Sequence, residues 1–297
     1  MAVASGHSFS LVSRYDKPIS TMKEWRDERR AVNAGWVPGK SAWEIANAWV
    51  GSGKPLVPAI LQRLLESHTL TRAVVIDRGV VERKTGLRYG PAGPRNHDLA
   101  LWAWENSPTA FVGIESKAND GFGETMQQQI DKAKRLRVQP KKRNTNLDER
   151  VEWLAECLLG VSFLADDNQN VPRGQREQEA RTKMLHLPYQ LFAGVAGTLL
   201  EAKKARSEIA VFIVHQFRTS YTNDRDIRAD AKRLHRFASL LIQSNSSPHD
   251  QLQLKVPLRC DNLVGPIYLK HRDYGEWTMP TEIPLLIGEI QTDRTLR

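Results

Sequence analysis

The apolar positions of this chain follow two different periods, which predicts strands and helices in alternation. Strand patterns, rich in β-branched residues or alternating in polarity, lie at residues 71–83, 97–104, 110–117, 207–217, 265–271 and 283–292. Helical spacing of apolar residues is found at 41–50, 56–68, 124–137, 147–161, 187–205 and 223–243. The strand pattern at 207–217 is the most apolar of the chain and should lie in the middle of a sheet.

The order of these elements predicts the fold class. A helix, three strands, further helices, a buried strand, a helix and late strands are typical of an α/β (α+β) domain, with a central mixed β-sheet flanked by helices. Residues 1–40 are expected to form an N-terminal arm, loose as far as about residue 18, and a short helix. Residues 41–297 are expected to form the domain, with a polar insertion around 140–186. Ser41 and Glu44 predict a capping box for the helix that begins there.

Composition narrows the class of protein. The 297 residues contain only two cysteines, Cys157 and Cys260, and neither lies in a CxxC pair, so a disulfide framework and a structural zinc site are not indicated. No apolar run reaches the length of a membrane helix, and residues 1–17 lack the features of a signal peptide. We therefore expect a cytoplasmic protein without a membrane partner.

The net charge of +9 indicates a polyanionic partner such as DNA or RNA. Basic residues gather between 131 and 143, and the candidates for phosphate contact there are Lys132, Lys134, Arg135, Lys141, Lys142 and Arg143. Arg173, Arg176 and Arg181 in the polar insertion are further candidates. The alternative is that this segment is simply a solvated helix end and loop.

Candidate chemistry lies at the ends of two consecutive strands. Asp98 opens one strand, and Glu115 and Lys117 close the next, where alternation puts both on one face. Antiparallel pairing would bring Asp98 close to Glu115, and a divalent cation relieves the repulsion between two such carboxylates. Oxygen ligands of this kind, with the carbonyl of Ser116 as a third, suit Mg²⁺ or Mn²⁺. Lys117 would then orient a water molecule or stabilise charge at phosphorus. The alternative is an ordinary ion pair of Glu115 and Lys117, contributing at most ~1 kcal/mol.

Asp98 followed by Glu115-x-Lys117 resembles the PD-(D/E)XK nuclease superfamily, whose members include restriction endonucleases, repair nucleases and resolvases. The resemblance covers roughly residues 41–217 and implies a restriction-endonuclease-like core, with Asp98 and Glu115 as metal ligands and Lys117 as the catalytic lysine. The proline that usually precedes the first acid is absent, since the local sequence is Asn-His-Asp. Blocks such as "NHDLALW" and "IESKANDGFG" are also similar to an uncharacterised bacterial family placed in this superfamily.

The resemblance implies further site residues on two helices. Superfamily members often add an acid from the first helix, for which Glu44 or Glu66 is available. Several carry a glutamine or tyrosine on the helix after the lysine strand. Gln190 is therefore a candidate catalytic residue and Tyr189 an alternative, although both are equally suited to packing and capping.

Three other residues near this constellation need an interpretation. His97 should point away from Asp98 by strand alternation and is left out of the set of metal ligands. His215 ends the most buried strand and is expected to be a satisfied histidine of the core or its edge. Phe122, in the glycine-rich turn after Lys117, is a candidate for stacking on a base.

The sequence thus predicts a Mg²⁺-dependent nuclease acting on DNA, which the resemblance extends to a restriction or defence endonuclease. One alternative is a non-catalytic nucleic-acid-binding protein that retains the nuclease fold, or a component of a larger complex. Another is a structural protein with no nucleic-acid role. A homodimer is compatible with cutting both strands, although no dimer stripe is evident in the sequence.

Overall fold

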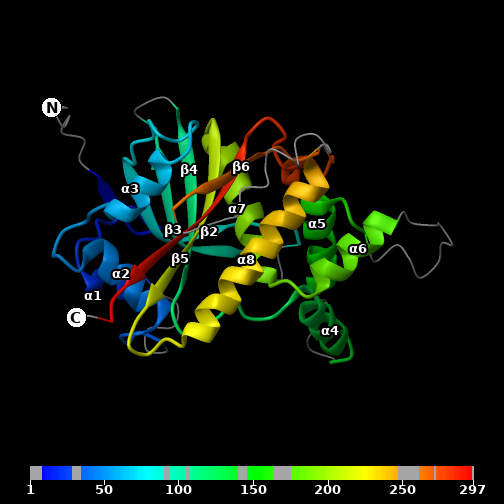
Figure 1. Cartoon of the computed structure of the whole chain (residues 1–297), viewed down its shortest axis with the longest axis horizontal. Helices are drawn as coiled ribbons and strands as arrows, with labels where there is room; N and C mark the ends of the chain where they lie inside the picture. Colours follow the sequence, from blue (N-terminus) through cyan, green and yellow to red (C-terminus); the bar gives the residue numbers. More distant parts are fainter. Residues whose placement is uncertain are drawn as a thin grey trace.

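A seven-stranded mixed β-sheet forms the middle of the protein, with helices on both of its faces (Figure 1). The computed structural model describes residues 9–28, 35–89, 94–104, 108–139, 146–162, 175–246, 261–270 and 272–295. The predicted fold class, a mixed α/β domain with a central sheet flanked by helices, is confirmed. None of the helices in this part of the chain is long and apolar enough to cross a membrane.

The sheet has the strand order β1-β2-β3-β4-β5-β7-β6. Its strands are β1 Ser10–Val12, β2 Arg78–Thr85, β3 Arg95–Ala103, β4 Ala110–Lys117, β5 Ile209–Arg218, β6 Leu263–Ile267 and β7 Leu285–Asp293. Strands β2, β3 and β4 pair antiparallel, whereas β4, β5 and β7 run parallel to one another. The edge strand β1 is parallel to β2, and the other edge strand, β6, is antiparallel to β7.

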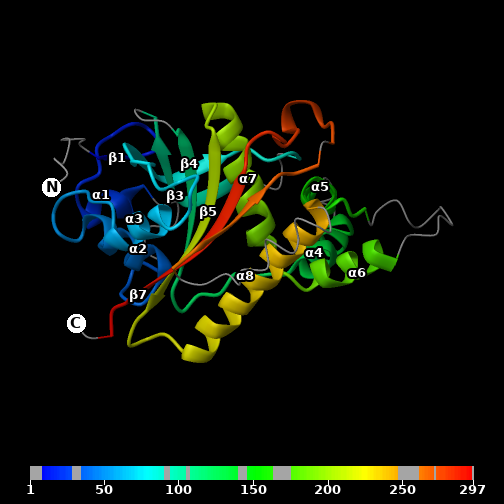
Figure 2. The same ribbon diagram turned by 45° about the horizontal axis from the view of Figure 1, so that its top comes forward.

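Two layers of helices cover the sheet (Figure 2). One face carries α1 Met22–Asp27, α2 Ser41–Val50 and α3 Ala59–Glu66. On the other face, α7 Tyr189–Ala205 and α8 Asp224–Asn245 pack on the sheet and α5 Leu147–Leu159 packs on both of these helices. Helices α4 Met126–Arg137 and α6 Gln175–Leu185 lie farther from the sheet, beside α5 and α8 (Figure 2). A short 3₁₀-helix at Gly275–Trp277 precedes β7. The apolar residues of each face form a separate hydrophobic cluster.

Strand β4 lies at the centre of the fold and is buried along its whole length. Its side chains alternate between the two clusters, so Val112 and Ile114 face α2 and Phe111 faces α7. Helix α7 packs close to the sheet because Gly194 and Gly197 lack side chains: an added Cβ would lie 2.6 Å from Phe212 or 2.9 Å from His97. The end of β4 is therefore held between two packed layers.

Two sequence predictions about the N-terminal half need correction. Residues 10–12 are an edge strand and not a loose arm, and Gly79 allows this pairing because its missing side chain leaves room for Leu11. Residues 71–77 are not strand, since the Thr71 hydroxyl donates to the Leu65 carbonyl and closes a turn after α3. The division into an arm and a domain stays a prediction.

The capping box predicted for α2 is also absent. Lys40 is the N-cap and makes no side-chain capping bond. The Glu44 carboxylate instead accepts the backbone N–H of Gly39 at 2.8 Å, while the Ser41 hydroxyl bonds to Asp120. A tertiary partner of Ser41 and a different local partner of Glu44 thus replace the motif that the sequence indicated.

Helix α6 lies inside the polar insertion, which the sequence marked only as polar. The helix spans Gln175–Leu185 and so occupies the end of the insertion, directly before α7. The late strand expected at 265–271 is instead β6 at Leu263–Ile267, and it pairs antiparallel with β7.

Replacement of Gly113 by alanine should destabilise the protein. An added Cβ would collide with the Thr198 hydroxyl and come within 3.1 Å of the His97 ring. We expect Gly113→Ala to lower the free energy of unfolding by about 1–3 kcal/mol, the usual cost of overpacking, as measured by urea denaturation. The cost should shrink in a Thr198→Ala background. Gly121→Ala, whose added Cβ meets nothing closer than 3.6 Å, is the matched control. Equal stability of Gly113→Ala and wild type would contradict the packing described here.

Candidate functional site

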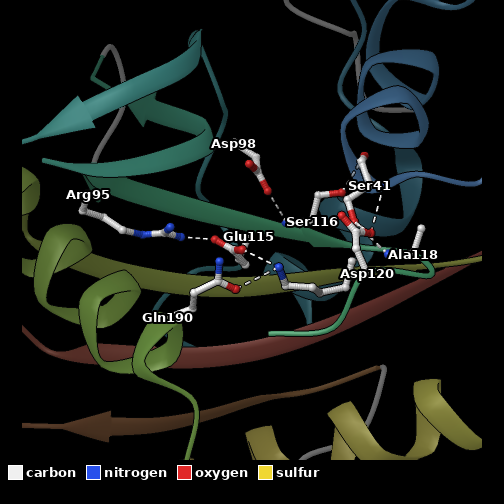
Figure 3. A network of polar contacts seen from close by, with 9 residues as sticks. Ser41, Arg95, Asp98, Glu115, Ser116, Ala118, Asp120 and Gln190 are labelled. Carbon is white, nitrogen blue, oxygen red and sulfur yellow. Dashed lines mark hydrogen bonds and ion pairs between the residues drawn. The ribbon is translucent and has the colours of Figure 1, made fainter. Parts of the chain in front are cut away.

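The carboxylate of Asp98 joins β3 to the end of β4. The backbone ladder between these strands begins at the pair Leu99 and Ile114, and just beyond it Asp98 Oδ2 accepts the N–H of Ser116 at 2.7 Å (Figure 3). The Asp98 side chain thus accepts a main-chain hydrogen bond at the point where the backbone pairing of β3 and β4 ends. This contact brings Asp98 next to Glu115, as the sequence predicted.

Glu115 and Lys117 face α7 from the end of β4, as strand alternation predicted. Lys117 Nζ lies 2.7 Å from Glu115 Oε1 and donates to Gln190 Oε1 at 3.0 Å (Figure 3). Glu115 is 3 % exposed and Lys117 6 % exposed, so this ion pair is buried. The four predicted catalytic residues, Asp98, Glu115, Lys117 and Gln190, therefore lie together.

Arg95 completes this group and was not predicted. Its Nη2 donates to Glu115 Oε2, so both oxygens of the Glu115 carboxylate contact a cation. Arg95 stands three residues before Asp98 at the start of β3. That position was the only sign of its role in the sequence, because a single arginine at a strand start is unremarkable.

A third carboxylate, that of Glu82, lies opposite Asp98 on β2. The pairs Val81–Leu99 and Arg83–His97 fix this register, and Glu82 itself has a positive φ of 51°. Its side chain is 9 % exposed and accepts a hydrogen bond from the Asn96 amide. Sequence reasoning missed Glu82 because the predicted start of its strand was too early for the register to be worked out.

The two acids that the resemblance suggested from the first helix have other contacts. Glu44 accepts the Gly39 N–H, and its second oxygen lies 3.5 Å from Arg294 Nε. Glu66 is exposed on α3 and accepts a bond from Gln62. The acid that adds to the field at Asp98 is thus Glu82 and not a helix residue.

The charges of the site shift its pKa values in opposite directions. Burial raises the pKa of Glu115, but the positive charges of Arg95 and Lys117 outweigh it and lower that pKa to about 2. For Asp98, burial and then the negative charges of Glu115 and Glu82 raise the pKa to about 8. Burial lowers the pKa of Lys117, yet the nearby carboxylates outweigh it and the pKa is raised. Asp98 is therefore the carboxylate of this group that burial and its neighbours leave least compensated.

The donor set agrees in chemistry with the predicted metal. Within the described ranges there is no group of three or more His, Cys, Asp or Glu side chains arranged to hold a metal ion. The carboxylates of Asp98 and Glu115 and the Ser116 carbonyl are hard oxygen donors of the kind Mg²⁺ takes, with waters filling the other positions. Glu115 could bind the cation through Oε2 only after Arg95 no longer contacts that atom. Asp98, raised in pKa among other carboxylates, is the group that a divalent cation would compensate.

A cavity of about 490 Å³ opens beside these residues. Arg95, Asn96 and Gln190 border it, together with Tyr189 and the backbone of Gly123. Its size lies within the ~300–1,000 Å³ typical of small-molecule sites. Arg95 and Gln190 thus touch both the buried ion pair and an accessible space.

Helix α2 holds the end of β4 from the other face. The Ser116 hydroxyl donates to the Ser41 carbonyl at 2.9 Å, and the Ser41 hydroxyl accepts the N–H of Ala118 at 2.9 Å (Figure 3). Asp120 accepts both the N–H and the hydroxyl of Ser41. These bonds fix the backbone on which Glu115 and Lys117 stand.

Both histidines near the site are buried and structural. His97 is 0 % exposed and packs edge-on against Phe111, and burial lowers its pKa to about 3, so it is neutral. His215 bonds to the Thr292 hydroxyl at 2.9 Å and stacks on Phe217, which confirms the predicted core histidine. Gly113 and Gly197, which make room for the His97 ring, were the signal in the sequence for its burial.

Phe122 does not have the role that the sequence suggested. It is 1 % exposed, with its ring centroid 5.3 Å from Lys117 Nζ, so it cannot stack on a base. The Phe122 ring packs in the apolar core beneath the Lys117 ammonium group and does not extend into solvent. Tyr189 borders the cavity, and its N–H donates to the Glu124 carbonyl, which ties the start of α7 to that turn.

The predicted basic segment is only partly described. Lys134 and Arg135 are exposed on the last turns of α4, whereas Lys132 pairs with Glu124 at 2.8 Å. Arg181 lies on α6. Lys141, Lys142, Arg143, Arg173 and Cys260 lie outside the described residues, as does the side chain of Arg176. The described cations thus give an exposed basic end to α4.

Comparison with known proteins places the chain in a family. Residues 18–266 match the family described as a domain of unknown function, DUF6946. The chain belongs to this family. The DUF6946 match spans every residue of the candidate site, from Glu82 to Gln190, and ends before β7. No curated protein and no solved structure matches the chain.

The raised pKa of Asp98 predicts how stability changes with pH. Its folded-state pKa of about 8 lies above the ordinary 3.8, so its stabilising contribution is complete below about pH 4 and is lost as the pH rises through 8. In EDTA, the free energy of unfolding should fall between about pH 4 and 8, by up to about 1.4 kcal/mol per pH unit for this one proton, and should level off above pH 8. Asp98→Asn should flatten that fall.

Two comparison variants make this test specific. Glu289, whose pKa burial raises to about 7, should contribute a separate part of the slope that Glu289→Gln removes. Glu66→Gln, on the exposed face of α3, should leave the slope unchanged. An Asp98→Asn protein with the wild-type slope in urea denaturation would contradict the described field at Asp98.

Proposed function

We propose that the protein is a Mg²⁺- or Mn²⁺-dependent nuclease that hydrolyses phosphodiester bonds of DNA. One observation carries the proposal: Asp98, Glu115 and Lys117 meet at the ends of two adjacent strands, beside a cavity and below the helix that supplies Gln190. Two carboxylates and a lysine in this arrangement supply cation ligands and a group that acts on the attacking water.

The surrounding topology supports the resemblance to the PD-(D/E)XK superfamily. Helices α2 and α3 precede three antiparallel strands, β2 to β4, and α7 then leads to β5, which is parallel to β4. The resemblance implies this order of helix, three strands, helix and strand. A restriction-endonuclease-like core accordingly forms part of the proposal.

The residues would divide the work as follows. Asp98, Glu115 and the Ser116 carbonyl would hold the cation, which supplies an acidified water and compensates charge at phosphorus. Lys117, kept protonated by its carboxylate neighbours, would donate to the water or to the charged phosphoryl oxygens. Gln190 holds the ammonium group of Lys117 in place at 3.0 Å and thereby orients it.

Arg95 has a role that the sequence did not suggest. Without a cation it neutralises Glu115, and it also lines the cavity that substrate would enter. With a cation on Glu115, the guanidinium of Arg95 would be free to donate to a phosphate oxygen, for which its planar donors are well suited.

The partner and setting belong to the same proposal. DNA fits the net charge of +9 and the exposed Lys134 and Arg135, whose contacts would make binding weaken with salt. A cytoplasmic location, a homodimer that cuts both strands and a restriction or defence role extend it. The buried free thiol of Cys157 supports the reducing setting.

A second function has an observation in its favour. Arg95 and Lys117 occupy both oxygens of Glu115, so the ion-paired group is complete without a metal. This arrangement suits a non-catalytic nucleic-acid-binding protein that retains the fold, alone or in a larger complex. Metal binding distinguishes the two functions.

Metal titration should reveal the competition at Glu115. We expect calorimetry to detect Mn²⁺ binding to the wild-type protein, loss of binding in Asp98→Ala, and about fivefold tighter binding in Arg95→Ala, because the arginine no longer competes for Oε2; this factor corresponds to ~1 kcal/mol. Arg83→Ala is the matched control, since Arg83 pairs with Glu201 away from the site. Absence of Mn²⁺ binding in both wild type and Arg95→Ala would favour the non-catalytic protein.

Cleavage assays test the enzyme directly. With Mg²⁺ or Mn²⁺, the protein should cut DNA, and Glu115→Ala or Lys117→Ala should reduce the rate by at least about 100-fold, the range expected for loss of a group that assists proton transfer or charge development. Lys54→Ala, on an exposed turn between α2 and α3, is the control and should cut normally. Cleavage that persists in both site variants would refute the assignment.

A further inference from the structure

A second cavity, of about 310 Å³, lies at the other end of α7. It is bordered by the loop after β1, by β2, by the end of β3 and by the last turn of α7. Helix α7 has 17 residues and so spans roughly 25 Å between this cavity and Gln190. The second cavity is therefore separate from the candidate nuclease site.

The lining of this cavity is cationic. Its charged side chains are four basic ones, Arg14, Arg78, Arg83 and Lys204, against two acids, Asp16 and Glu201. The two acids are already occupied: Asp16 pairs with Arg78, and Glu201 accepts both Nε and Nη2 of Arg83 at 3.2 and 3.0 Å. Of the two remaining cations, Arg14 pairs with Glu28, which lies outside the lining, and Lys204 has no ion pair with a described residue.

These two remaining cations are available to a ligand. Lys204 is exposed and has no ion pair or hydrogen bond with any described residue. Arg14 Nε forms an ion pair with Glu28 Oε2 at 3.9 Å, and no described residue accepts a hydrogen bond from the Nη atoms of Arg14. The Lys204 ammonium group and the Nη atoms of Arg14 are therefore the donors that remain for an anionic ligand.

The cavity also has an aromatic wall. Trp102 and Trp104 lie with ring centroids 5.6 Å apart, and Trp102 is held from behind by Phe111 and by the guanidinium of Arg83. Trp102 is 5 % exposed, but Trp104 is 47 % exposed. The backbone N–H of Trp104 donates to the Asp77 carboxylate at 2.6 Å, so its main chain is fixed. A large indole that is anchored yet half-exposed offers a ready stacking surface.

We propose that this cavity binds a nucleoside phosphate, with its base on Trp104 and its phosphate between Lys204 and Arg14. The aromatic wall suits a flat ring and the cationic wall suits an anion, so a small ligand that carries both groups fits the cavity better than an apolar compound or a simple anion. Proteins that bind single-stranded nucleic acid without sequence preference combine stacking of bases on aromatic side chains with contacts to the phosphates. The ligand is either a free nucleotide or one nucleotide of a single strand, since both present the same groups.

Calorimetric titration in EDTA tests this site independently of any cleavage. The probes are dAMP, deoxyadenosine, inorganic phosphate and the pentanucleotide (dA)₅. We expect saturable binding of dAMP and at least tenfold weaker binding of deoxyadenosine and of phosphate. Trp104→Ala should weaken dAMP binding by about tenfold, within the range measured for loss of one stacked base, and Trp104→Phe should restore most of it. Lys204→Glu should weaken it to a similar extent.

Matched variants separate this site from general effects. Tyr268→Ala removes another half-exposed aromatic ring, and Lys54→Glu makes the same charge change elsewhere, so both should bind dAMP normally. Asp98→Ala should also bind normally, which keeps this test distinct from that of the nuclease. Equal affinity for dAMP and (dA)₅ supports a free nucleotide, whereas much tighter binding of (dA)₅ that still depends on Trp104 supports a strand.

Three results would overturn the proposal. The first is no saturable binding of either dAMP or (dA)₅. The second is binding that Trp104→Ala and Lys204→Glu leave unchanged. The third is phosphate binding as tight as that of dAMP, which would make the cavity a simple anion site.

Discussion

The hydrogen bond from the Ser116 N–H to the Asp98 carboxylate determines the arrangement at this end of the sheet. It forms where the β3–β4 ladder stops, so a side chain and not the backbone continues the pairing. Because it ties Asp98 to the residue after Glu115, the two carboxylates must stay close whatever their protonation. Nearby cations or a proton must then offset the repulsion between the two carboxylates.

Arg95 and Lys117 offset the repulsion at Glu115, and the resulting ion-paired group is buried. Such a group is stable only if its geometry is good and its remaining donors are satisfied. Gln190 takes one donor of Lys117, and the packing of α7 on β4 keeps the group out of bulk water. The small residues of α7 and the paired charges of Glu115, Arg95 and Lys117 thus depend on each other. Close packing of α7 lowers the local dielectric, which strengthens the ion pairs, and the pairing allows these charges to be buried.

Sequence alone could predict the parts of this arrangement that depend on local pattern. Alternation placed Glu115 and Lys117 on one face, and consecutive strands brought Asp98 beside them. It could not predict Glu82, because the place of Glu82 opposite Asp98 follows from the exact register of β2 against β3, including the positive φ at Glu82. Nor could it predict Arg95, which contacts Glu115 from beyond the point where the β3–β4 ladder stops. It also misplaced the partners of Ser41 and Glu44, since a tertiary contact with Asp120 and a local contact with Gly39 replaced the expected capping box. Local motifs were lost where a distant segment offered a better partner.

A count of charges explains how the group can be complete without a metal and still suit one. Glu82, Asp98 and Glu115 carry three negative charges when ionised, and Arg95 and Lys117 carry two positive ones. One negative charge is left over, and the raised pKa of Asp98 means that a proton neutralises it near pH 7. If a divalent cation replaced that proton while Arg95 stayed, the balance would become positive by one. Neutrality returns when the guanidinium leaves Glu115, so cation binding and release of Arg95 towards the cavity are linked by the same electrostatic requirement.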